Sequence, residues 1–216
     1  MKDYLEIEEV KEMFRCISRQ MISSEKQLTE IDNIIGDGDH GIGMAIGFRA
    51  VDEALDNMNS DTINEFFKEI GMTLLDAMGG ASGVIFGTMF ISGYGAAPMT
   101  NQLDLDTLSS MMKKSLENIK LRGKAKVGDK TMIDSYEPAV LALEQCSRNK
   151  KSLSEGVTNA WIAAKNGVEA SKLYSAKKGR AESYGNLSIG TPDPGAVSVS
   201  IIFEAMNRYI TDEWRK

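Results

Sequence analysis

The sequence predicts an all-α protein made of antiparallel amphipathic helices packed side by side. Apolar residues recur at spacings of three and four along most of the chain, which is the stripe that a helix turns toward a core. No segment shows sustained alternation of apolar and polar residues over the length of a strand. The chain also contains only 4 Pro and as many as 13 Met, a composition that suits helices around a Met-tolerant core.

The stripes predict the helices in order along the chain. The first stripe is Val10, Met13, Phe14, Ile17 and Met21, and later segments repeat its periodicity. Because the connections are short, successive helices are expected to be antiparallel neighbours. The longest non-helical stretch is expected at residues 176–193, which are rich in Lys, Gly and Ser. The predicted helices span residues 7–23, 26–34, 42–58, 61–78, 83–96, 105–121, 131–148 and 153–175, with a ninth at 195–212.

Length and composition fit a single globular domain over residues 1–216. The net charge of −6 argues against a nucleic-acid binder and against binding to an anionic membrane surface. No run approaches the roughly 18 apolar residues of a membrane span. Cys16 and Cys146 match no metal or disulfide spacing, and the acidic N-terminus is unlike a signal peptide. We therefore expect a cytoplasmic protein.

The first unusual segment runs from Asp32 to Gly43. It places Asp32, Asp37 and Asp39 close together, followed by His40, the only histidine of the chain. Carboxylates this close repel one another unless a cation neutralises them, and hard divalent ions prefer oxygen ligands. Glycines between them allow the backbone to fold closely. The segment is therefore either a divalent metal site or a solvated acidic turn between two helices.

Two other motifs fit this segment only by letter. A dinucleotide fingerprint over residues 36–41 lacks a preceding strand and would place aspartates against a pyrophosphate. A calcium loop beginning at Asp37 would need a glutamate where Phe48 stands. Both interpretations are rejected.

The second segment, residues 78–88, carries Gly79, Gly80, Ala81, Ser82 and Gly83 before an apolar helix. Ser82 is predicted to cap that helix, whose free N–H groups could bind an anion. The same small residues are equally typical of a close contact between two helices.

The third segment, residues 122–132, resembles a P-loop, but Asp129 is inserted before Lys130 and no strand precedes it. A Walker A loop is therefore not expected. The glycines and cations still suit an anionic ligand, whereas Asp129 could instead cap the following helix.

The fourth region combines Lys177, Lys178 and Arg180 with the turn Asp193-Pro194-Gly195. Arg offers a fork that matches phosphate oxygens, and Pro194 is predicted at the first position of a helix. The alternative is a solvated charged loop. Carboxylates, helix starts, glycines and an arginine together suit a metal–nucleotide complex, and loops near residues 36, 80, 125 and 190 could share one rim of an antiparallel bundle.

In their order and separations these motifs resemble the nucleotide-binding L subunits of dihydroxyacetone kinases, often called DhaL. The matching stretches are IGDGDHG at 35–41, GMTLLDAMGGASG at 71–83, GDKTM at 128–132, and residues 179–196 from Gly179-Arg180-Ala181 through Asp193-Pro194-Gly195-Ala196; the resemblance covers residues 5–210. It implies a barrel of about eight amphipathic helices with the nucleotide at one rim.

The resemblance also implies how the site is built. Asp32, Asp37 and Asp39 would hold two Mg²⁺ ions, which bind the phosphates of ADP or ATP. No residue of this chain is assigned a catalytic role, because the metals and the donors of the site would carry the charge of the transferred phosphoryl group. The residues expected to contact the nucleotide are His40, Gly41, Ile42, Gly43, Ala81, Ser82, Gly123, Met132, Arg180, Asp193, Pro194 and Gly195.

The implied partners are two further subunits. A K subunit would hold the hydroxyketone through a covalent bond to a histidine, and an M subunit of the phosphotransferase system would rephosphorylate ADP. A transcriptional regulator and a homodimer are further options. Two departures concern the acceptor and the phosphate contacts: Gly43 stands where the family often has Asn, and Leu187 where many relatives have Arg.

Other functions remain open at this point. The chain could be a nucleotide-binding regulatory or interaction module, or a kinase subunit that acts on a related sugar ketone with exchangeable ATP. A carrier of an apolar ligand is a further alternative, since a barrel of helices could enclose one.

Overall fold

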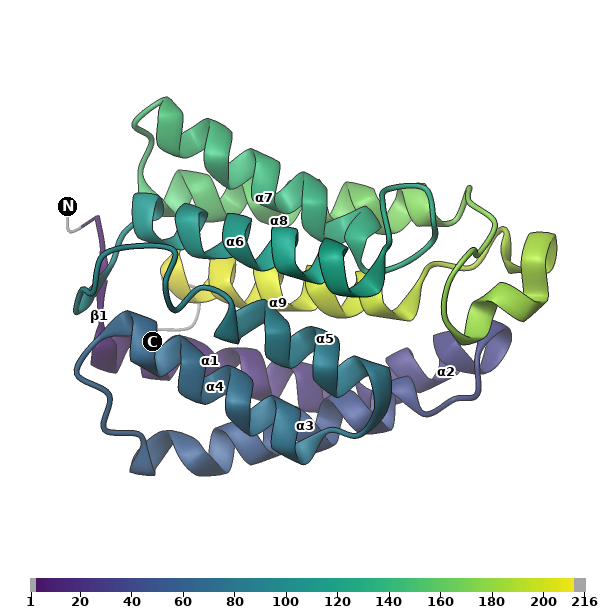
Figure 1. Cartoon of the computed structure of the whole chain (residues 1–216), viewed down its shortest axis with the longest axis horizontal. Helices are drawn as coiled ribbons and strands as arrows, with labels where there is room; N and C mark the ends of the chain where they lie inside the picture. The colour runs from purple at the N-terminus through teal and green to yellow at the C-terminus, as the bar shows by residue number, and fades with distance from the viewer. Residues whose placement is uncertain (1–2, 212–216) are drawn as a thin grey trace.

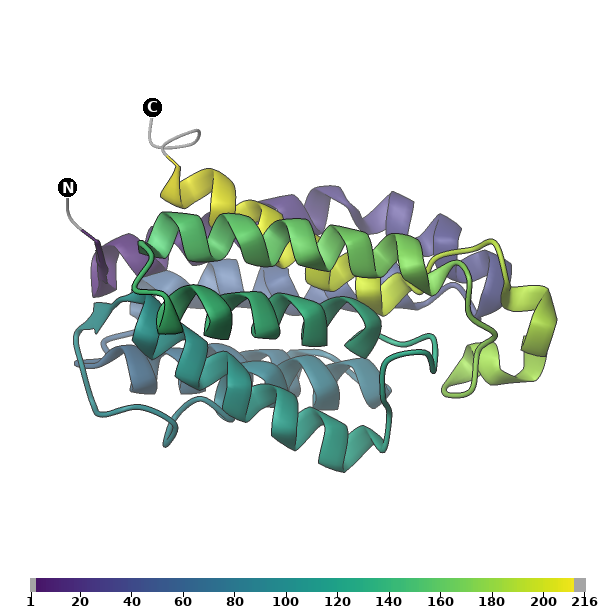
Figure 2. The same ribbon diagram turned by 90° about the horizontal axis from the view of Figure 1, so that it is seen from above.

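The computed structural model describes residues 3–211 and contains, within that range, a closed ring of eight antiparallel helices. Each helix packs on the next, and α9 returns to pack on α1. Figures 1 and 2 show the helices side by side along the long dimension of the molecule. The predicted all-α barrel is therefore confirmed. The ring consists of α1 (Ile7–Ser23), α3 (His40–Ala54), α4 (Ile63–Ala77), α5 (Gly80–Ile91), α6 (Leu105–Gly123), α7 (Ile133–Arg148), α8 (Leu153–Ser171) and α9 (Pro194–Ile210).

Two short helices lie beside one rim of the ring. Helix α2 (Glu25–Ile35) contacts α3 and α9, and it also contacts the 3₁₀ helix η2 (Arg180–Ser188). This rim, at the right in Figure 1, gathers the connections on either side of α2, between α4 and α5, between α6 and α7, and between α8 and α9. The prediction that these loops share one rim is confirmed.

Several predicted boundaries were wrong where glycines hide the start or end of a helix. Helix α3 begins at His40 and not at 42, and α5 spans Gly80–Ile91 and not 83–96. A second 3₁₀ helix, η1 (Leu55–Asn57), takes up the predicted end of the third helix, and α8 ends at Ser171. The stretch expected to be non-helical contains η2. The predicted end of the last helix, residue 212, lies outside the described residues.

A two-residue ladder closes the opposite rim. Strand β1 (Leu5–Glu6) pairs antiparallel with β2 (Gln102–Leu103), with Leu5 opposite Leu103. A ladder of two residues is too short to produce an alternating pattern, so the sequence does not predict it. It nevertheless ties the start of α1 to the long connection between α5 and α6.

Side chains fill the interior of the ring. The ring of Phe14 on α1 makes edge-to-face contacts with Phe66, Phe67 and Phe90, at centroid distances of 5.3 to 5.5 Å. Since these partners belong to α4 and α5, which are not next to α1 in the ring, the cluster crosses the barrel. Helices α4 and α5 also approach closely. A Cβ at Gly71 would lie only 2.6 Å from the carbonyl oxygen of Gly87, so the glycine permits this approach.

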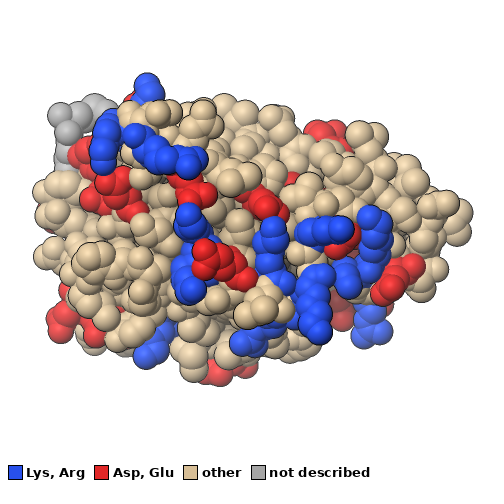
Figure 3. Space-filling view, turned by 45° about the horizontal axis from the view of Figure 1, so that its top comes forward, with Lys and Arg blue, Asp and Glu red and all other residues tan. Residues whose placement is uncertain are grey.

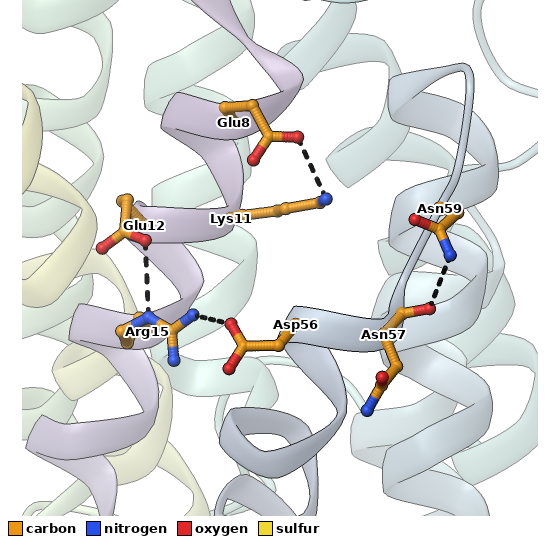
Figure 4. Close-up of polar contacts among 7 residues, drawn as sticks. All are labelled: Glu8, Lys11, Glu12, Arg15, Asp56, Asn57 and Asn59. Atoms are coloured by element: carbon orange, nitrogen blue, oxygen red, sulfur yellow. Dashed lines mark hydrogen bonds and ion pairs between the residues drawn. The ribbon is translucent and has the colours of Figure 1, made fainter.

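Ion pairs join neighbouring elements on the outer surface. Figure 4 shows Arg15 of α1 between Glu12 and Asp56. Its Nη2 lies 2.7 Å from Oδ1 of Asp56 in η1, and its Nη1 lies 3.6 Å from Asp52 of α3. Exposed pairs of this kind contribute little to stability, so the apolar interior provides most of it. Among residues 3–211, the structure has no helix with the length and apolar character that crossing a membrane requires.

The cross-barrel cluster predicts a large cost for one truncation. We expect Phe14→Ala to lower the free energy of unfolding by about 3–5 kcal/mol, since it removes a fully buried ring and leaves a cavity. Leu121→Ala, at an exposed position on α6, should change it by less than about 0.5 kcal/mol. Urea unfolding followed by circular dichroism measures both. A Phe14→Ala midpoint equal to that of the unchanged chain would contradict the assigned core.

Candidate functional site

A cavity of about 280 Å³ opens at the rim where the four groups of connections meet. Its lining comes from α2 and the loop after it, the start of α5, the α6–α7 connection, and the segment from 178 to the start of α9. The structure thus brings together residues that are far apart in the sequence. The predicted site residues in the lining are Asp32, Asp37, Asp39, His40, Ala81, Ser82, Gly123, Met132, Arg180, Asp193, Pro194 and Gly195.

Three predicted contact residues lie outside this lining, on the first turn of α3. Gly41 is buried against α2, where an added Cβ would lie 2.3 Å from the carbonyl oxygen of Glu25. Ile42 is 48% exposed. Gly43 faces open space, with no atom within 4 Å of an ideal Cβ, so a larger side chain would fit there. Gly41 is therefore required for the packing of α3 on α2, whatever its role toward a ligand.

The three aspartates converge in the cavity. One carboxylate oxygen from each of Asp32, Asp37 and Asp39 lies within 4.8 Å of the others. Asp32 is buried on α2, whereas Asp37 and Asp39 are exposed on the loop that follows. Although Asp39 is exposed, its partial loss of solvent raises its pKa, and the neighbouring carboxylates of Asp37 and Asp32 raise it further. The cluster is therefore short of positive charge, and oxygen donors at this spacing suit a hard divalent cation.

Two glycines allow the loop to fold over Asp32. A Cβ at Gly36 would lie 2.1 Å from Oδ1 of Asp32. Gly38 has a φ of +78°, and its Cβ would lie 2.2 Å from Oδ1 of Asn33. A side chain at either position would push the loop away and separate the carboxylates. The Asp-Gly-Asp spacing is thus a requirement of the cluster.

His40 links three helices below the aspartates. Its backbone N–H donates to Oδ2 of Asp32 (3.1 Å), and its Nε2 lies 2.8 Å from Oγ of Ser198 on α9. Because the Ser198 hydroxyl donates to the carbonyl of Pro194, it accepts from Nε2, which leaves Nδ1 to accept from the Ser82 hydroxyl (3.5 Å). Burial lowers the pKa of His40, and this effect outweighs the Asp32 carboxylate, which raises it. The imidazole is therefore neutral, and its Nδ1 orients the Ser82 hydroxyl.

The start of α5 differs from the prediction. The N-cap residue is Gly79, and Ser82 is the third residue of the helix, so the predicted Ser82 cap was wrong. The adjacent glycines conceal the helix start from a pattern that looks for a hydroxyl cap. Ala81 and Ser82 lie in the first turn and line the cavity, where backbone N–H groups are free of helical partners.

The start of α9 agrees with the prediction. Asp193 is the N-cap, its Oδ2 accepts from the N–H of Ala196 (2.8 Å), and Pro194 is the first helical residue. Burial raises the pKa of Asp193 to about 7, although the Ala196 N–H lowers it. The α7 start differs, because Asp129 does not cap it. Asp129 instead accepts from the N–H of Lys126, 3.0 Å away.

Further lining residues were not predicted because their signals are those of a core or of a surface. The stripes that contain Ile85, Phe86 and Ile119 read as ordinary core positions, yet these side chains reach the cavity wall. Lys130 was predicted only as one of the cations of the third motif that suit an anionic ligand, and not as a contact residue. The lining residues that were not among the predicted contact residues are Ile35, Ile85, Phe86, Ile119, Ala125, Lys130, Thr131, Ile133, Lys178, Gly179 and Ala181.

Helix η2 reaches over the acidic loop. Nε of Arg180 lies 3.1 Å from Oδ2 of Asp37, and the Tyr184 hydroxyl donates to the carbonyl of Gly36 (3.3 Å). Lys and Arg side chains also gather toward the rim end of the face in Figure 3. Exposed cations flank the cavity at Arg122, Lys124 and Lys178. Positive charge of this kind attracts anionic ligands.

Comparison with known proteins gives a family match over most of the chain. A DAK2 domain matches residues 34–208. The ADP-binding subunit DhaL of the PEP-dependent dihydroxyacetone kinase of Escherichia coli K12 is 38% identical over 187 residues, which cover 86% of this chain and 89% of that protein. The ADP-binding subunit DhaL of the PTS-dependent dihydroxyacetone kinase of Lactococcus lactis is 39% identical over 179 residues, which cover 83% and 85%.

Solved structures show the same fold within a larger enzyme. The native dihydroxyacetone kinase of C. freundii matches with a TM-score of 0.73 and 26% identity, over 92% of this chain and 34% of that chain. The same enzyme in complex with AMP-PNP and Mg²⁺ matches with the same TM-score over 33% of its chain. This chain therefore spans about a third of that enzyme. Together with the domain match, the relatives that it covers nearly end to end show that the chain belongs to the DAK2 family and, within it, to the group of ADP-binding DhaL subunits of dihydroxyacetone kinases.

Proposed function

We propose that this chain carries ADP or ATP as a magnesium complex and transfers a phosphoryl group to a hydroxyketone, such as dihydroxyacetone, held on a separate K subunit. An M subunit of the phosphotransferase system would rephosphorylate the bound ADP. The observation that carries the proposal is the convergence of Asp32, Asp37 and Asp39 in a cavity whose other walls are helix starts and apolar side chains. The aspartates and helix starts would suit the metal-bound phosphates of a nucleotide, and the apolar side chains would suit its nucleoside.

The aspartates fit a magnesium site. Their oxygens lie within 4.8 Å of one another, and Gly36 and Gly38 leave no space for side chains that would separate them. In our proposal these carboxylates hold two Mg²⁺ ions. When bound, the metal supplies positive charge that offsets the charge of the phosphate oxygens.

The phosphates would lie among N–H groups and one arginine. The first turns of α5 and α9 line the cavity through Ala81, Ser82 and Gly195, and helix starts favour anions. Arg180 reaches the same place and carries a guanidinium that matches phosphate oxygens. His40 would act through Ser82, because both of its ring nitrogens contact serine hydroxyls.

The nucleoside would lie against the apolar part of the cavity. This wall consists of Ile85 and Phe86 on α5, Ile119 on α6, and Met132 and Ile133 at the start of α7. Apolar walls with a few fixed polar groups are the usual composition of a site for a small organic ligand. Gly123 at the end of α6 leaves the wall open, since the only atom near its Cβ position is in Ile85, 3.9 Å away.

Several large apolar side chains, here called the collar, are exposed in the segments that end at the rim, and they support docking of a subunit that holds the acceptor. Large apolar residues exposed together mark interaction surfaces more often than scattered ones do. Leu187, one of the departures from the family pattern, is 83% exposed on η2 and belongs to this collar, so it bears on the choice of partner and not on the phosphates. The collar consists of Ile34, Ile42, Leu121, Val127, Leu173, Leu187 and Ile189.

Transfer would proceed through positioning and neutralisation of charge. Phosphoryl transfer needs its in-line partners aligned and the negative charge of the equatorial oxygens stabilised. Ser82, Arg180 and the helix starts orient the phosphates, and the cavity walls exclude water from the nucleoside. The residues of this chain form no covalent intermediate in this scheme.

Removing one carboxylate should abolish metal-dependent binding. We expect Asp37→Asn to weaken ADP binding in the presence of Mg²⁺ by at least roughly 100-fold, because outer-shell changes alone cost 10–100-fold at metal sites. Calorimetric titration of ADP with and without Mg²⁺ measures the effect. The matched control is Asp61→Asn, an exposed aspartate before α4. Equal affinities of Asp37→Asn and the unchanged chain would refute the metal assignment.

Phosphoryl transfer should depend on both partner subunits. With purified K and M subunits, phosphoenolpyruvate and the general phosphotransferase proteins, we expect phosphorylated hydroxyketone to form, and none when this chain is omitted or carries Asp37→Asn. Phosphorus NMR detects the product. Tight ADP binding without any product, for dihydroxyacetone and related ketones alike, would favour a regulatory binding module.

The mode of nucleotide use can be measured on the chain alone. If ADP is a coenzyme, we expect the purified protein to retain ADP through gel filtration, because the N–H groups, Arg180 and the metal site hold the phosphates together. Absorbance at 260 nm and mass spectrometry of the eluted protein measure it. A protein that elutes empty but binds added ATP would favour exchange with ATP.

A further inference from the structure

Lys130 is the unusual residue of the α6–α7 connection. Its side chain is only 1% exposed, although it stands in a loop beside the cavity. Its backbone has a φ of +59°, a conformation that residues other than glycine seldom adopt. A buried ammonium is tolerated only where acceptors compensate for the water it has lost. Its acceptors therefore indicate what the residue does.

Those acceptors are two backbone carbonyls from distant parts of the chain. Nζ of Lys130 donates to the carbonyl of Ser171 (2.8 Å) and to the carbonyl of Thr191 (2.5 Å). Ser171 is the last residue of α8, and Thr191 precedes the α9 cap residue Asp193 by two positions. The ammonium therefore joins the two ends of the excursion formed by residues 172–190.

This excursion borders the cavity beside the aspartates, where we place the phosphates. It carries Arg180, whose Nε pairs with Asp37, and Tyr184, whose hydroxyl donates to Gly36. At its base the N–H of Gly190 donates to the carbonyl of Lys172 (2.8 Å). A loss of the contacts that hold the two ends would therefore act on Arg180 and on the α9 start together.

We propose that Lys130 is a positioning residue for the nucleotide, which it serves by clamping both ends of the 172–190 excursion and so holding Arg180 and the α9 N-terminus over the phosphates. The inference rests on the proposed function. It adds a role for a residue outside the predicted contacts. Lys130 acts through the backbone of other segments, and its clamp joins three parts of the rim: the α6–α7 connection, the end of α8 and the start of α9.

The clamp depends on the charge of the lysine as well as on its length. An ammonium donates charge-assisted hydrogen bonds to both carbonyls at once, and the carboxylates of Asp193 and Asp134 are near enough to interact with it. A side chain without donors would leave the buried carbonyl of Ser171 and the partly buried carbonyl of Thr191 without this partner. Water that entered from the adjoining cavity would take the place of the ammonium at these carbonyls and loosen the excursion.

The first test compares two lysine variants. We expect Lys130→Met to weaken ADP binding in the presence of Mg²⁺ by roughly 10–100-fold, the range found for residues that orient the groups of a site. Lys165→Met, an exposed lysine of α8, should leave the affinity unchanged. Calorimetry at a temperature where both variants are folded gives the values. Equal affinities of Lys130→Met and the unchanged chain would overturn the inference.

A second measurement separates positioning from direct contact and from loss of stability. Hydrogen exchange should show faster exchange of the amides at 172–190 in Lys130→Met, with the core of α1 and α4 unchanged. Weaker ADP binding with unchanged exchange at 172–190 would overturn positioning in favour of a direct contact. Faster exchange throughout the barrel would overturn it in favour of a stability effect.

If Lys130→Met does not fold, chemical rescue of a second variant tests the clamp. Lys130→Ala opens a space connected to the cavity, so ethylammonium should restore part of the ADP affinity while tetramethylammonium, which cannot donate, should not. Rescue by neither ion in a folded variant would count against the clamp. If the unchanged chain itself fails to bind ADP, the proposed function fails. If it binds ADP and Lys130→Met binds equally well, only the clamp fails.

Discussion

The mutual repulsion of three carboxylates is the constraint on which the rim depends. Two unit charges about 4 Å apart interact by roughly 4 kcal/mol at an effective dielectric of 20, a large part of the roughly 5–15 kcal/mol that stabilises a domain. Asp32, Asp37 and Asp39 nevertheless converge, because the glycines at 36 and 38 let the loop fold closely over α2, where a Cβ at either position would clash with Asp32 or Asn33. The site answers the repulsion in part with Arg180 and with the raised pKa of Asp39. A divalent cation answers it more completely.

The ring of helices explains why one rim can hold such a site. With an even number of helices in the ring, the last helix, α9, packs antiparallel on the first, α1. Every second connection therefore lies at the same end of the barrel. Those connections supply the acidic loop, the starts of α5 and α9, and the Lys130 loop. The interior behind them is filled by the cluster around Phe14, which favours the rim over the centre of the barrel as the ligand site.

The sequence predicted the elements that local patterns specify. The stripes gave the helices, and Asp193-Pro194 gave the start of α9 because cap and first-turn chemistry are local. Ser82 failed as a cap because Gly79 and Gly80 begin the helix earlier without a hydroxyl.

The missed features were those that depend on distant segments. The burial of Lys130 could not be read from its neighbours, since its acceptors lie 41 and 61 residues further along the chain. The same holds for Ile85 and Ile119, whose apolar stripes do not distinguish a wall of the core from a wall of the cavity. Local patterns therefore located the rim but not its supporting contacts.

The contact between Arg180 and Asp37 shows how the rim can accept a ligand at small cost. Both side chains are well exposed, at 79% and 40%, and such pairs contribute only about 0–1 kcal/mol. The guanidinium can therefore leave the carboxylate for a phosphate without a large loss. The Lys130 contacts differ, because the ammonium is buried and donates to two backbone carbonyls. The rim thus combines a weak, exposed contact at Arg180 with the contacts of a buried ammonium at the base of the excursion, and such an arrangement would let Arg180 change partners while the α9 start stays in place.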